Sequence, residues 1–286
     1  MSYFILGSSS YLGKKIIHYL QKKELPVVGI SRNINKDLSC EQLLLDENFN
    51  ISNLIDTNQK GYVFNCLNSY YKNPTEGQVF EMTKINFDLP KKLIDEVYTN
   101  ELNLKLINFS SYFNFIDPPP ESLEYQISKK KLTNYICESE FNGNIKEIII
   151  SDVFGTSDMR NKIFNIILKN RLQKKEISFS NPGNFVNLIF VEKLVEFVFQ
   201  FLHNEDTSSS FLNKYSIQVG LLDELIENIL NGNEVAFENY FTVESRFDSS
   251  KANYGDTILA DITDTVVNEN HKSNKFHGGR IDKKKA

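Results

Sequence analysis

The stretch Leu123 to Ile136 reads LEYQISKKKLTNYI and places a tyrosine four residues before the first lysine of a run of three. If this stretch is helical, Tyr125 and Lys129 lie on one face, because positions i and i+4 are neighbours on a helix. A phenol titrates at about pH 10 and is a poor acid at neutral pH until a nearby cation lowers its pKa. The pair could therefore transfer a proton. The alternative is a half-buried tyrosine beside solvated lysines.

A second group of residues could hold a phosphate. The segment FILGSSSYLGKKIIHYL follows the first apolar run, and Gly7, Ser10 and Gly13 stand at the positions of a glycine-rich turn. Small residues let the backbone approach a pyrophosphate, and the N-terminus of the following helix attracts the anion. The alternative is a plain turn that begins a helix. The residues expected to contact a dinucleotide here are Gly7, Ser9, Ser10, Tyr11, Leu12 and Gly13.

The end of the second apolar run, PVVGISRN, indicates which dinucleotide is preferred. The acidic residue that would bind a ribose 2′-hydroxyl is absent, and Ser31 and Arg32 occupy its place. An arginine pairs with a 2′-phosphate, so NADP(H) is favoured over NAD(H), although Arg32 could also be an ordinary surface residue. Asp46, which ends the run LLLD, could contact the adenine edge or could be a turn residue.

Composition limits the classes of partner. A chain of 286 residues that is 41% hydrophobic can bury a sizeable core, and its net charge of -5 argues against nucleic-acid binding. The four histidines and three dispersed cysteines show no metal-ligand spacing, so we expect no metal. The first apolar run ends at Gly7, and no apolar span of membrane length follows, which predicts a cytoplasmic protein without a membrane partner.

The elements that must position these residues are visible in the apolar pattern. Runs of strand length (YFIL, PVVGI, YVFNCL, LKLINFS and KEIIIS) alternate with amphipathic segments such as KKIIHYLQKK and LPKKLIDEV. This alternation predicts an α/β protein with a doubly wound parallel sheet covered on both faces. After Gly155 the pattern changes to a helix (KIFNIILKNRLQKK), a short strand around Ile177 to Phe179, and then the strand NLIFV and the helix EKLVEFVFQFL.

These patterns also predict how the chain is divided. We expect a dinucleotide-binding core, a smaller substrate-binding lobe at the C-terminal side, and a disordered tail that lacks any apolar period. The core comprises residues 1–155 with 185–203 returning to it, the lobe residues 156–184 and 204–266, and the tail residues 267–286.

Three features now stand in order along the chain: the glycine turn, Ser111 at the end of LKLINFSS, and Tyr125 with Lys129 on the next helix. Together they resemble the extended short-chain dehydrogenase/reductases, the NAD(P)-dependent epimerase/dehydratase family that acts on nucleotide sugars. The resemblance continues through Asn86 in KINFDLPKKLI, through SDVFGTSD at the family's V-Y-G-P turn and through NLIFVEKLVEFV at its F-I-Y-V-D-D segment. It covers roughly residues 1 to 202 and implies a Rossmann-type sheet.

Within that family, INFSS followed closely by YQISKKKL is most similar to the CDP-paratose and CDP-abequose synthase group. This resemblance implies NADPH-dependent reduction of the 4-keto group of a CDP-linked 6-deoxysugar for surface polysaccharide. Ser111 would hydrogen-bond the carbonyl, Tyr125 would protonate the forming alkoxide, and Lys129 would lower the tyrosine pKa and hold the nicotinamide ribose. The family also suggests a homodimer through the helices around residues 89–97 and 129–136.

The chain departs from the family where arginines usually help to hold the phosphates of the sugar nucleotide. Ile149 and Val186 stand at those positions. The cations of the next helix, Lys162, Lys169 and Arg171, could replace them or could belong to a solvated helix face.

Other functions remain open at this stage. A 4-epimerase uses the same serine, tyrosine and lysine but retains its NAD. A dehydratase is disfavoured, because Tyr112 and Phe113 stand where it would need an acid–base pair. A non-catalytic nucleotide-binding homologue would explain Ser10, Ile149 and Val186 but not the retained catalytic residues.

Overall fold

The computed structural model describes residues 1–45, 55, 60–99, 102–115, 123–138, 144–204, 206, 208–244 and 254–278. The chain forms two compact units, and each is continuous in space but not in sequence. The first comprises Met1–Ile150 and Val195–Ser210, and the second comprises Ser151–Leu194 and Phe211–Ala286.

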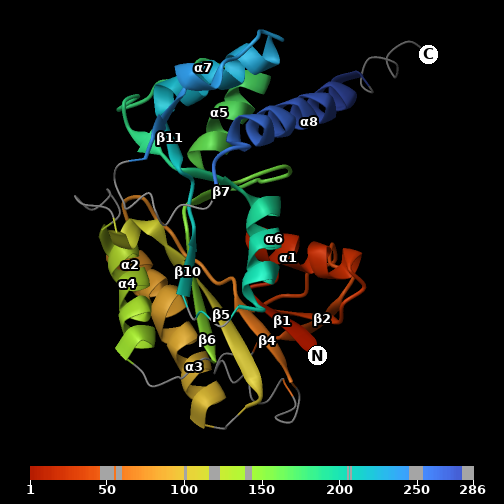
Figure 1. The fold of residues 1–286 in the computed structure, drawn as a ribbon, viewed down its shortest axis with the longest axis vertical. Helices are drawn as coiled ribbons and strands as arrows, with labels where there is room; N and C mark the ends of the chain where they lie inside the picture. Colours follow the sequence, from red (N-terminus) through yellow and green to blue (C-terminus); the bar gives the residue numbers. More distant parts are fainter. Residues whose placement is uncertain are drawn as a thin grey trace. The chain divides into compact units, whose positions relative to one another are not determined.

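The first unit is built on a seven-stranded sheet (Figure 1) with the strand order β10-β6-β5-β4-β1-β2-β3. The strands are β1 (Ser2–Leu6), β2 (Val27–Ser31), β3 (Glu41–Leu44), β4 (Gly61–Asn65), β5 (Leu104–Ser111), β6 (Ile145–Ile150) and β10 (Ser208–Phe211). The neighbouring strands from β1 to β6 pair in parallel. The predicted doubly wound parallel sheet is therefore confirmed.

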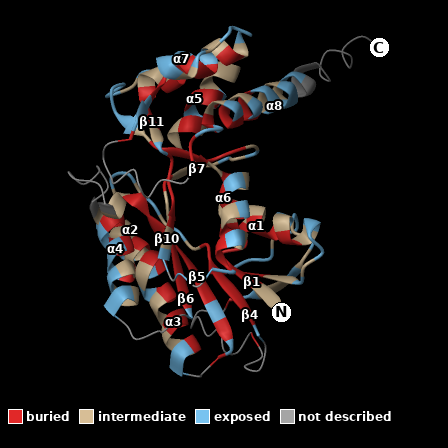
Figure 2. Cartoon of the chain, viewed as in Figure 1, coloured by how far each residue is buried: buried red, intermediate tan, exposed pale blue. Residues whose placement is uncertain are grey.

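Helices cover both faces of this sheet. Figure 1 shows α2, α3 and α4 on one face and α1 on the other, and Figure 2 shows that the strands and the inner sides of these helices are buried. Their bounds are α1 (Tyr11–Lys22), α2 (Glu76–Thr83), the π-helix η1 (Lys84–Asp88), α3 (Leu89–Thr99), the 3-10 helix η2 (Tyr112–Phe115), α4 (Leu123–Glu138) and α6 (Val191–Phe201). The end of α6 packs on the α1 face, where the ring of Phe199 stacks on Tyr19 at 4.6 Å.

The sheet order locates the place where a ligand can bind. From β1 the chain continues outward to β2 and β3 and then returns to β4 on the other side of β1. In doubly wound sheets, ligands bind at the carboxyl ends of the strands beside this change of direction. Leu6 pairs with Asn65 across the two strands that flank it. The glycine turn after β1 and the loop after β4 therefore meet at this edge.

In its described residues, the second unit contains the three helices α5, α7 and α8 and two small sheets. Its elements are β7 (Asp152–Phe154), α5 (Ile163–Leu172), β8 (Phe185–Val186), β9 (Leu188–Phe190), β11 (Tyr215–Gln218), α7 (Val219–Leu230), η3 (Phe237–Asn239), β12 (Phe241–Val243) and α8 (Ile258–Gly278). β7 pairs in parallel with β9, and β11 pairs antiparallel with both β12 and β8.

Two expectations for the second unit are wrong. Residues 177–179 form no strand, and within the described chain they have no ladder partner, without which an extended segment is not a strand. The tail expected to be disordered from residue 267 is helical as far as Gly278. Buried apolar residues four apart, Ile258 and Ile262, anchor α8, and helix formation propagates cooperatively into the polar part. Residues 279–286 lie outside the described part.

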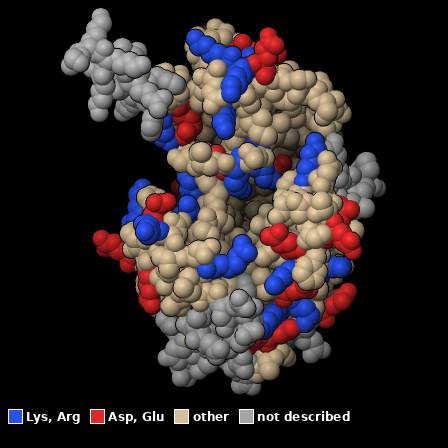
Figure 3. Space-filling model, turned by 180° about the vertical axis from the view of Figure 1, so that it is seen from behind, with Lys and Arg blue, Asp and Glu red and all other residues tan. Residues whose placement is uncertain are grey.

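The described helices and the face drawn in Figure 3 bear on membrane partners and on charge. None of the described helices is long and apolar enough to cross a bilayer. On the face drawn in Figure 3, lysine and arginine side chains are interspersed with aspartate and glutamate. In the part of the chain that the structure describes, no three histidine, cysteine or carboxylate side chains gather as metal ligands.

Candidate active site

The turn between β1 and α1 needs glycine at two positions. Gly7 has φ +81°, and a Cβ there would lie 3.0 Å from the carbonyl of Cys66. A Cβ on Gly13 would lie 2.5 Å from the carbonyl oxygen of Gly7. Ser10, at the usual place of the middle glycine, is the N-cap of α1 and accepts a hydrogen bond from Gly13 N at 3.0 Å. Ser10 therefore caps α1, and the N-terminus of α1 lies at the glycine turn.

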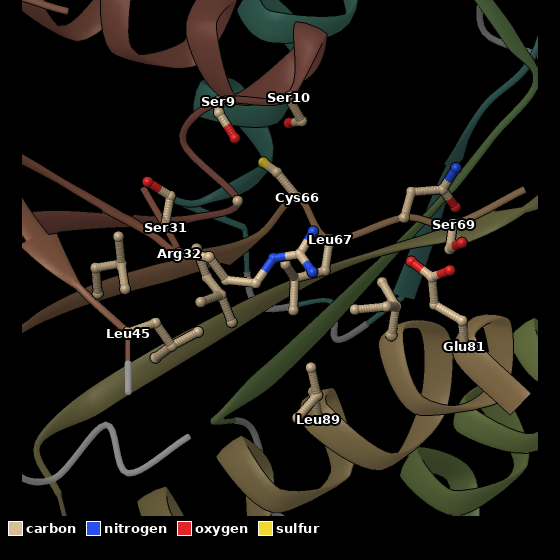
Figure 4. Close-up of a pocket in the computed structure, with 15 residues that line it drawn as sticks. Ser9, Ser10, Ser31, Arg32, Leu45, Cys66, Leu67, Ser69, Glu81 and Leu89 are labelled. Carbon is tan, nitrogen blue, oxygen red and sulfur yellow. The ribbon is translucent and has the colours of Figure 1, made fainter. Parts of the chain in front are cut away.

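This turn borders a pocket of about 260 Å³ at the switch in strand order (Figure 4). Its walls come from the turn after β1, the ends of β2 and β4, and the helices α2 to α3. The lining residues are Leu6, Gly7, Ser9, Ser10, Ile30, Ser31, Arg32, Leu45, Cys66, Leu67, Asn68, Ser69, Glu81, Ile85 and Leu89.

The pocket brings together five of the residues expected to bind a dinucleotide: Gly7, Ser9, Ser10, Ser31 and Arg32. Three others, Tyr11, Leu12 and Gly13, lie in the first turn of α1 and do not line it. Asp46 lies outside the described residues.

Arg32 is the cation of this pocket. The hydroxyl of Ser31, the last residue of β2, donates a hydrogen bond to the Asn33 carbonyl at 2.6 Å and so fixes the turn that carries Arg32. Figure 4 shows the arginine side chain extended across the pocket, and no described residue forms a salt bridge with it. A carboxylate approaches from α2, where Glu81 accepts a hydrogen bond from the Tyr71 hydroxyl at 2.8 Å. The cation is thus available to an anionic ligand.

The three consecutive lysines of helix α4 differ in their burial. Tyr125 and Lys129 are buried, with 9% and 5% of their surface exposed, whereas Lys130 and Lys131 are exposed. A helix turns by about 100° per residue, so the two later lysines are rotated away from the buried face. The expectation that Tyr125 and Lys129 share a face different from that of the other lysines agrees with this arrangement.

The phenol of Tyr125 is oriented by a residue of the pocket. It donates a hydrogen bond to Asn68 Oδ1 at 3.1 Å, and Asn68 lines the pocket after β4. The rings of Tyr70 and Phe113 stand edge-on to Tyr125 at 5.2 Å and 6.2 Å. Ser111 ends β5 nearby, and its hydroxyl accepts from Phe113 N at 3.3 Å. Ser111 and Tyr125 therefore both contact Phe113, and Tyr125 contacts the pocket through Asn68.

Lys129 is held as a buried cation. Its ammonium donates a hydrogen bond to the Phe109 carbonyl at 2.8 Å. Burial lowers its pKa from the usual value to about 8, and the negative charge of Glu147 opposes that shift. The lysine is therefore still charged at neutral pH, and a cation one helical turn from a phenol favours the phenolate.

Asn86, which belongs to the segment KINFDLPKKLI that shares in the family resemblance, has contacts that the sequence did not indicate. It lies in the π-helix η1 and is almost fully buried. Its side chain accepts from Ser69 N at 2.9 Å and donates to Ser69 O at 2.8 Å and to Ser128 Oγ at 3.1 Å. It therefore ties the loop that carries Asn68 to the helix that carries Lys129.

The cations considered for holding a sugar-nucleotide phosphate are mostly engaged within the second unit. Arg171 contacts Asp223 at 2.6 Å and Glu227 at 2.8 Å, and Lys162 contacts Asp152 at 3.3 Å. Lys169 is exposed on α5. Ile149 lies in β6 and Val186 in β8, so neither strand offers the arginine that the family usually has there.

Residues 3–217 match the sequence model of the NAD dependent epimerase/dehydratase family. The chain belongs to this family. The match includes the glycine turn, the pocket and the buried pair on α4. None of the curated proteins compared with the chain matches it in sequence.

Several solved enzymes of similar fold cover nearly the whole chain. UDP-glucose 4-epimerase from Thermotoga maritima, solved with UDP-glucose, has a TM-score of 0.70 at 15% identity, covering 93% of this chain and 98% of its own. UDP-glucuronic acid 4-epimerase from Bacillus cereus, solved with NAD, has a TM-score of 0.70 at 14% identity (96% and 99%). dTDP-glucose 4,6-dehydratase from Bacillus anthracis, also with NAD, has 0.71 at 13% (96% and 97%). At these identities the likeness establishes the fold.

The glycine turn can be tested with a matched pair of substitutions. Gly13→Ala is expected to weaken dinucleotide binding more than tenfold and to lower the melting temperature, because its Cβ would collide with the Gly7 carbonyl. Gly77→Ala is the control, since a Cβ on this α2 residue meets nothing within 4 Å and should stabilise the helix by about 0.5–1 kcal/mol. Fluorescence titration and thermal unfolding give both readouts. Equal affinity in the two variants would contradict the role of the turn.

Proposed function

We propose that this protein reduces the 4-keto group of a nucleotide-activated 6-deoxysugar, CDP-linked by its sequence resemblance, with NADPH as reductant. The observation that carries the proposal is the buried pair Tyr125 and Lys129 on one face of α4, connected through Asn68 to a pocket that contains Arg32. Family membership supports an oxidoreductase of the short-chain type.

The residues present fit a nicotinamide dinucleotide. Gly7 and Gly13 allow a turn too tight for any side chain, and the N-terminus of α1 faces that turn, which suits a pyrophosphate. In this proposal Arg32 would pair with a 2′-phosphate, and Lys129 would hold the nicotinamide ribose. When bound, the cofactor supplies the hydride that adds to the carbonyl carbon.

Side chains of the protein bind and protonate the oxygen of the carbonyl. Ser111 donates a hydrogen bond to it, and Tyr125 transfers its phenolic proton to it, so that the ketone becomes an alcohol. Lys129 stabilises the phenolate that remains, and solvent reprotonates the tyrosine. The reduction adds one hydride to the carbonyl carbon and one proton to the carbonyl oxygen.

Arg32 is proposed to select NADPH over NADH. Arg32→Ala should raise the Kd for NADPH about 10- to 100-fold and that for NADH less than threefold, because only NADPH has a 2′-phosphate to lose its charge-assisted partner. Arg32→Lys is the control and should retain part of the preference, since lysine keeps the charge but not the bidentate geometry. Equal losses for both cofactors in a fluorescence titration would count against this assignment.

A 4-epimerase is the second candidate, and the solved UDP-sugar 4-epimerases of the same fold favour it. An epimerase would use the same serine, tyrosine and lysine but would return the hydride to the opposite face of the ketone. It would therefore interconvert C4 epimers without net consumption of added reductant. A non-catalytic nucleotide-binding protein is disfavoured by the burial of an intact Tyr125 and Lys129 pair.

One assay separates these candidates. Purified protein is incubated with NADPH or NADH and a panel of CDP-, dTDP- and GDP-4-keto-6-deoxysugars while nicotinamide absorbance is followed. In a parallel incubation it receives NAD and UDP-sugars, and the C4 epimers of the products are analysed. Stoichiometric oxidation of NADPH supports the reductase. Interconversion of UDP-sugar epimers without oxidation supports the epimerase, and inactivity throughout supports the non-catalytic reading.

Two further proposals concern the rest of the chain. Residues 156–184 and 211–266 are proposed to select the sugar nucleotide, with its phosphates held by groups other than Ile149 and Val186. Residues 204–210, expected in the same lobe, belong instead to the first unit, where β10 joins the sheet. A homodimer through α3 and α4 is also proposed, and sedimentation of the purified protein tests it.

A further inference from the structure

We propose that Glu147 is a positioning residue that keeps Lys129 in its charged form through a buried polar network. The inference rests on the proposed function for the role of Lys129 in catalysis, but the electrostatic link can be measured without it.

Glu147 lies in β6 with 5% of its surface exposed, an environment that is costly for a carboxylate. Its Oε1 accepts from Thr133 Oγ1 at 2.9 Å and from Asn108 Nδ2 at 3.2 Å. Among the described residues no lysine or arginine forms a salt bridge with it. Neutral donors converge on the carboxylate, which is the arrangement that favours its ionised form.

The network extends through three neighbouring strands and α4. Asn65 of β4 donates to Asn108 Oδ1 at 2.9 Å, so the amide that faces Glu147 is fixed from behind. Ser110 and Thr133 share a hydrogen bond of 2.9 Å, and Asn114 donates to both hydroxyls. Each polar group is therefore oriented by the next, and the carboxylate is the acceptor at the centre.

Lys129 borders this network on two sides. Thr133, which contacts Glu147, follows Lys129 by one turn on the same helix. The Phe109 carbonyl, which accepts from the ammonium, is next in sequence to Asn108. Both charges are therefore buried in the layer between α4 and strands β5 and β6, where low polarisability strengthens their attraction over distances longer than a contact.

Few other charges act on the ammonium. The Cys66 thiol after β4 faces it, and burial raises the pKa of that thiol, which keeps it neutral. Tyr125 precedes Lys129 by one turn on α4. From η1, the neutral amide of Asn86 contacts Ser128, the residue before Lys129. Of the described groups that act on Lys129, Glu147 is the only carboxyl, and burial raises its own pKa while Lys129 opposes that rise.

The decisive comparison is between removing the charge and removing a hydrogen bond. Glu147→Gln keeps an acceptor for Thr133 and Asn108 but is neutral, whereas Thr133→Val keeps the carboxylate and loses one donor. If Glu147 supports the ammonium, Glu147→Gln should lower the pKa of Lys129 by about half a unit or more, and the alkaline limb of kcat/KM should move equally. Thr133→Val should reduce thermal stability but leave the pKa of Lys129 and the alkaline limb of kcat/KM unchanged.

The pKa is measured in the cofactor-free protein by NMR titration of the lysine side-chain nitrogens, with Lys129→Met used to assign the signal. A reciprocal measurement remains decisive even if Glu147→Gln does not fold. Because the coupling acts equally on both partners, Lys129→Met should raise the carboxyl pKa of Glu147 by the amount that Glu147→Gln would lower that of Lys129.

The outcomes separate the inference from the proposed function. Unmoved pKa values, with stability losses alike in Glu147→Gln and Thr133→Val, would make Glu147 a merely structural residue and overturn the inference. Shifted pKa values in a protein that reduces no sugar nucleotide would support the electrostatic link and count against the proposed reaction.

Discussion

Replacing Tyr125 by phenylalanine is expected to lower kcat at least a hundredfold while leaving the affinity for NADPH within about threefold. The substitution removes the phenolic hydroxyl that donates to Asn68 and keeps the ring that packs against Tyr70 and Phe113. Little packing is lost, so folding should be preserved. Single-turnover oxidation of bound NADPH measures the chemical step directly.

Tyr70→Phe provides the matched control for that experiment. Tyr70 contacts the Tyr125 ring edge-on and is 41% exposed, so its hydroxyl can be removed beside the same site without touching the proposed acid. Its kcat should stay within about twofold of the wild-type value. If Tyr125→Phe retains a tenth or more of wild-type kcat, the tyrosine is not the acid.

The second large effect is expected among the three lysines of α4. Lys129→Gln should reduce kcat/KM at least a hundredfold, about 2.7 kcal/mol, because it removes the buried ammonium one helical turn after Tyr125. Lys130→Gln and Lys131→Gln should remain within about threefold, since both side chains are exposed. Three small and similar effects would mean that Lys129 has no catalytic role and that this stretch is an ordinary solvated helix.

The pKa of Lys129 predicts how activity and stability depend on pH. Its pKa in the folded chain is about 8, below the usual value for lysine, because burial disfavours the charge. Activity that needs the ammonium should therefore be complete below about pH 8 and fall as pH rises through it. Between the folded and unfolded pKa values the unfolded chain binds more protons, so this group makes the free energy of unfolding rise with pH in that interval. A pH-rate profile and chemical unfolding at several pH values check both signs.

Much of the fold could be predicted because it depends on local patterns. Continuous apolar runs determine buried parallel strands, and the glycine turn requires residues without side chains. The burial of Lys129 and exposure of Lys130 follow from helical periodicity once Tyr125 is placed inward. The final helix was missed because its polar half is stabilised by its continuity with a buried apolar half rather than by its own composition.

Other residues of the site left no recognisable signal. Asn68 and Glu147 act through contacts with residues distant in sequence, Tyr125 and Thr133, that exist only after α4 has packed on the sheet. Glu147 stands within KEIIIS, a run from which the sequence predicts only a strand. Its role depends on which hydroxyls and amides the neighbouring elements present to it, and spacing along the chain does not encode that.

The late return of the chain to the first unit affects how the protein is made. Strand β6, with the sequence IKEIII, is flanked in the finished sheet by β5 and β10, and β10 begins about 60 residues after β6 ends. At 5–20 residues per second, the ribosome needs roughly 3–12 s to supply that edge partner. During this interval a nascent chain exposes an apolar strand edge that can pair with other chains. Protein made without chaperones, or cut short before Ser208, should therefore aggregate through β6 even though every residue up to Ile150 has been synthesised.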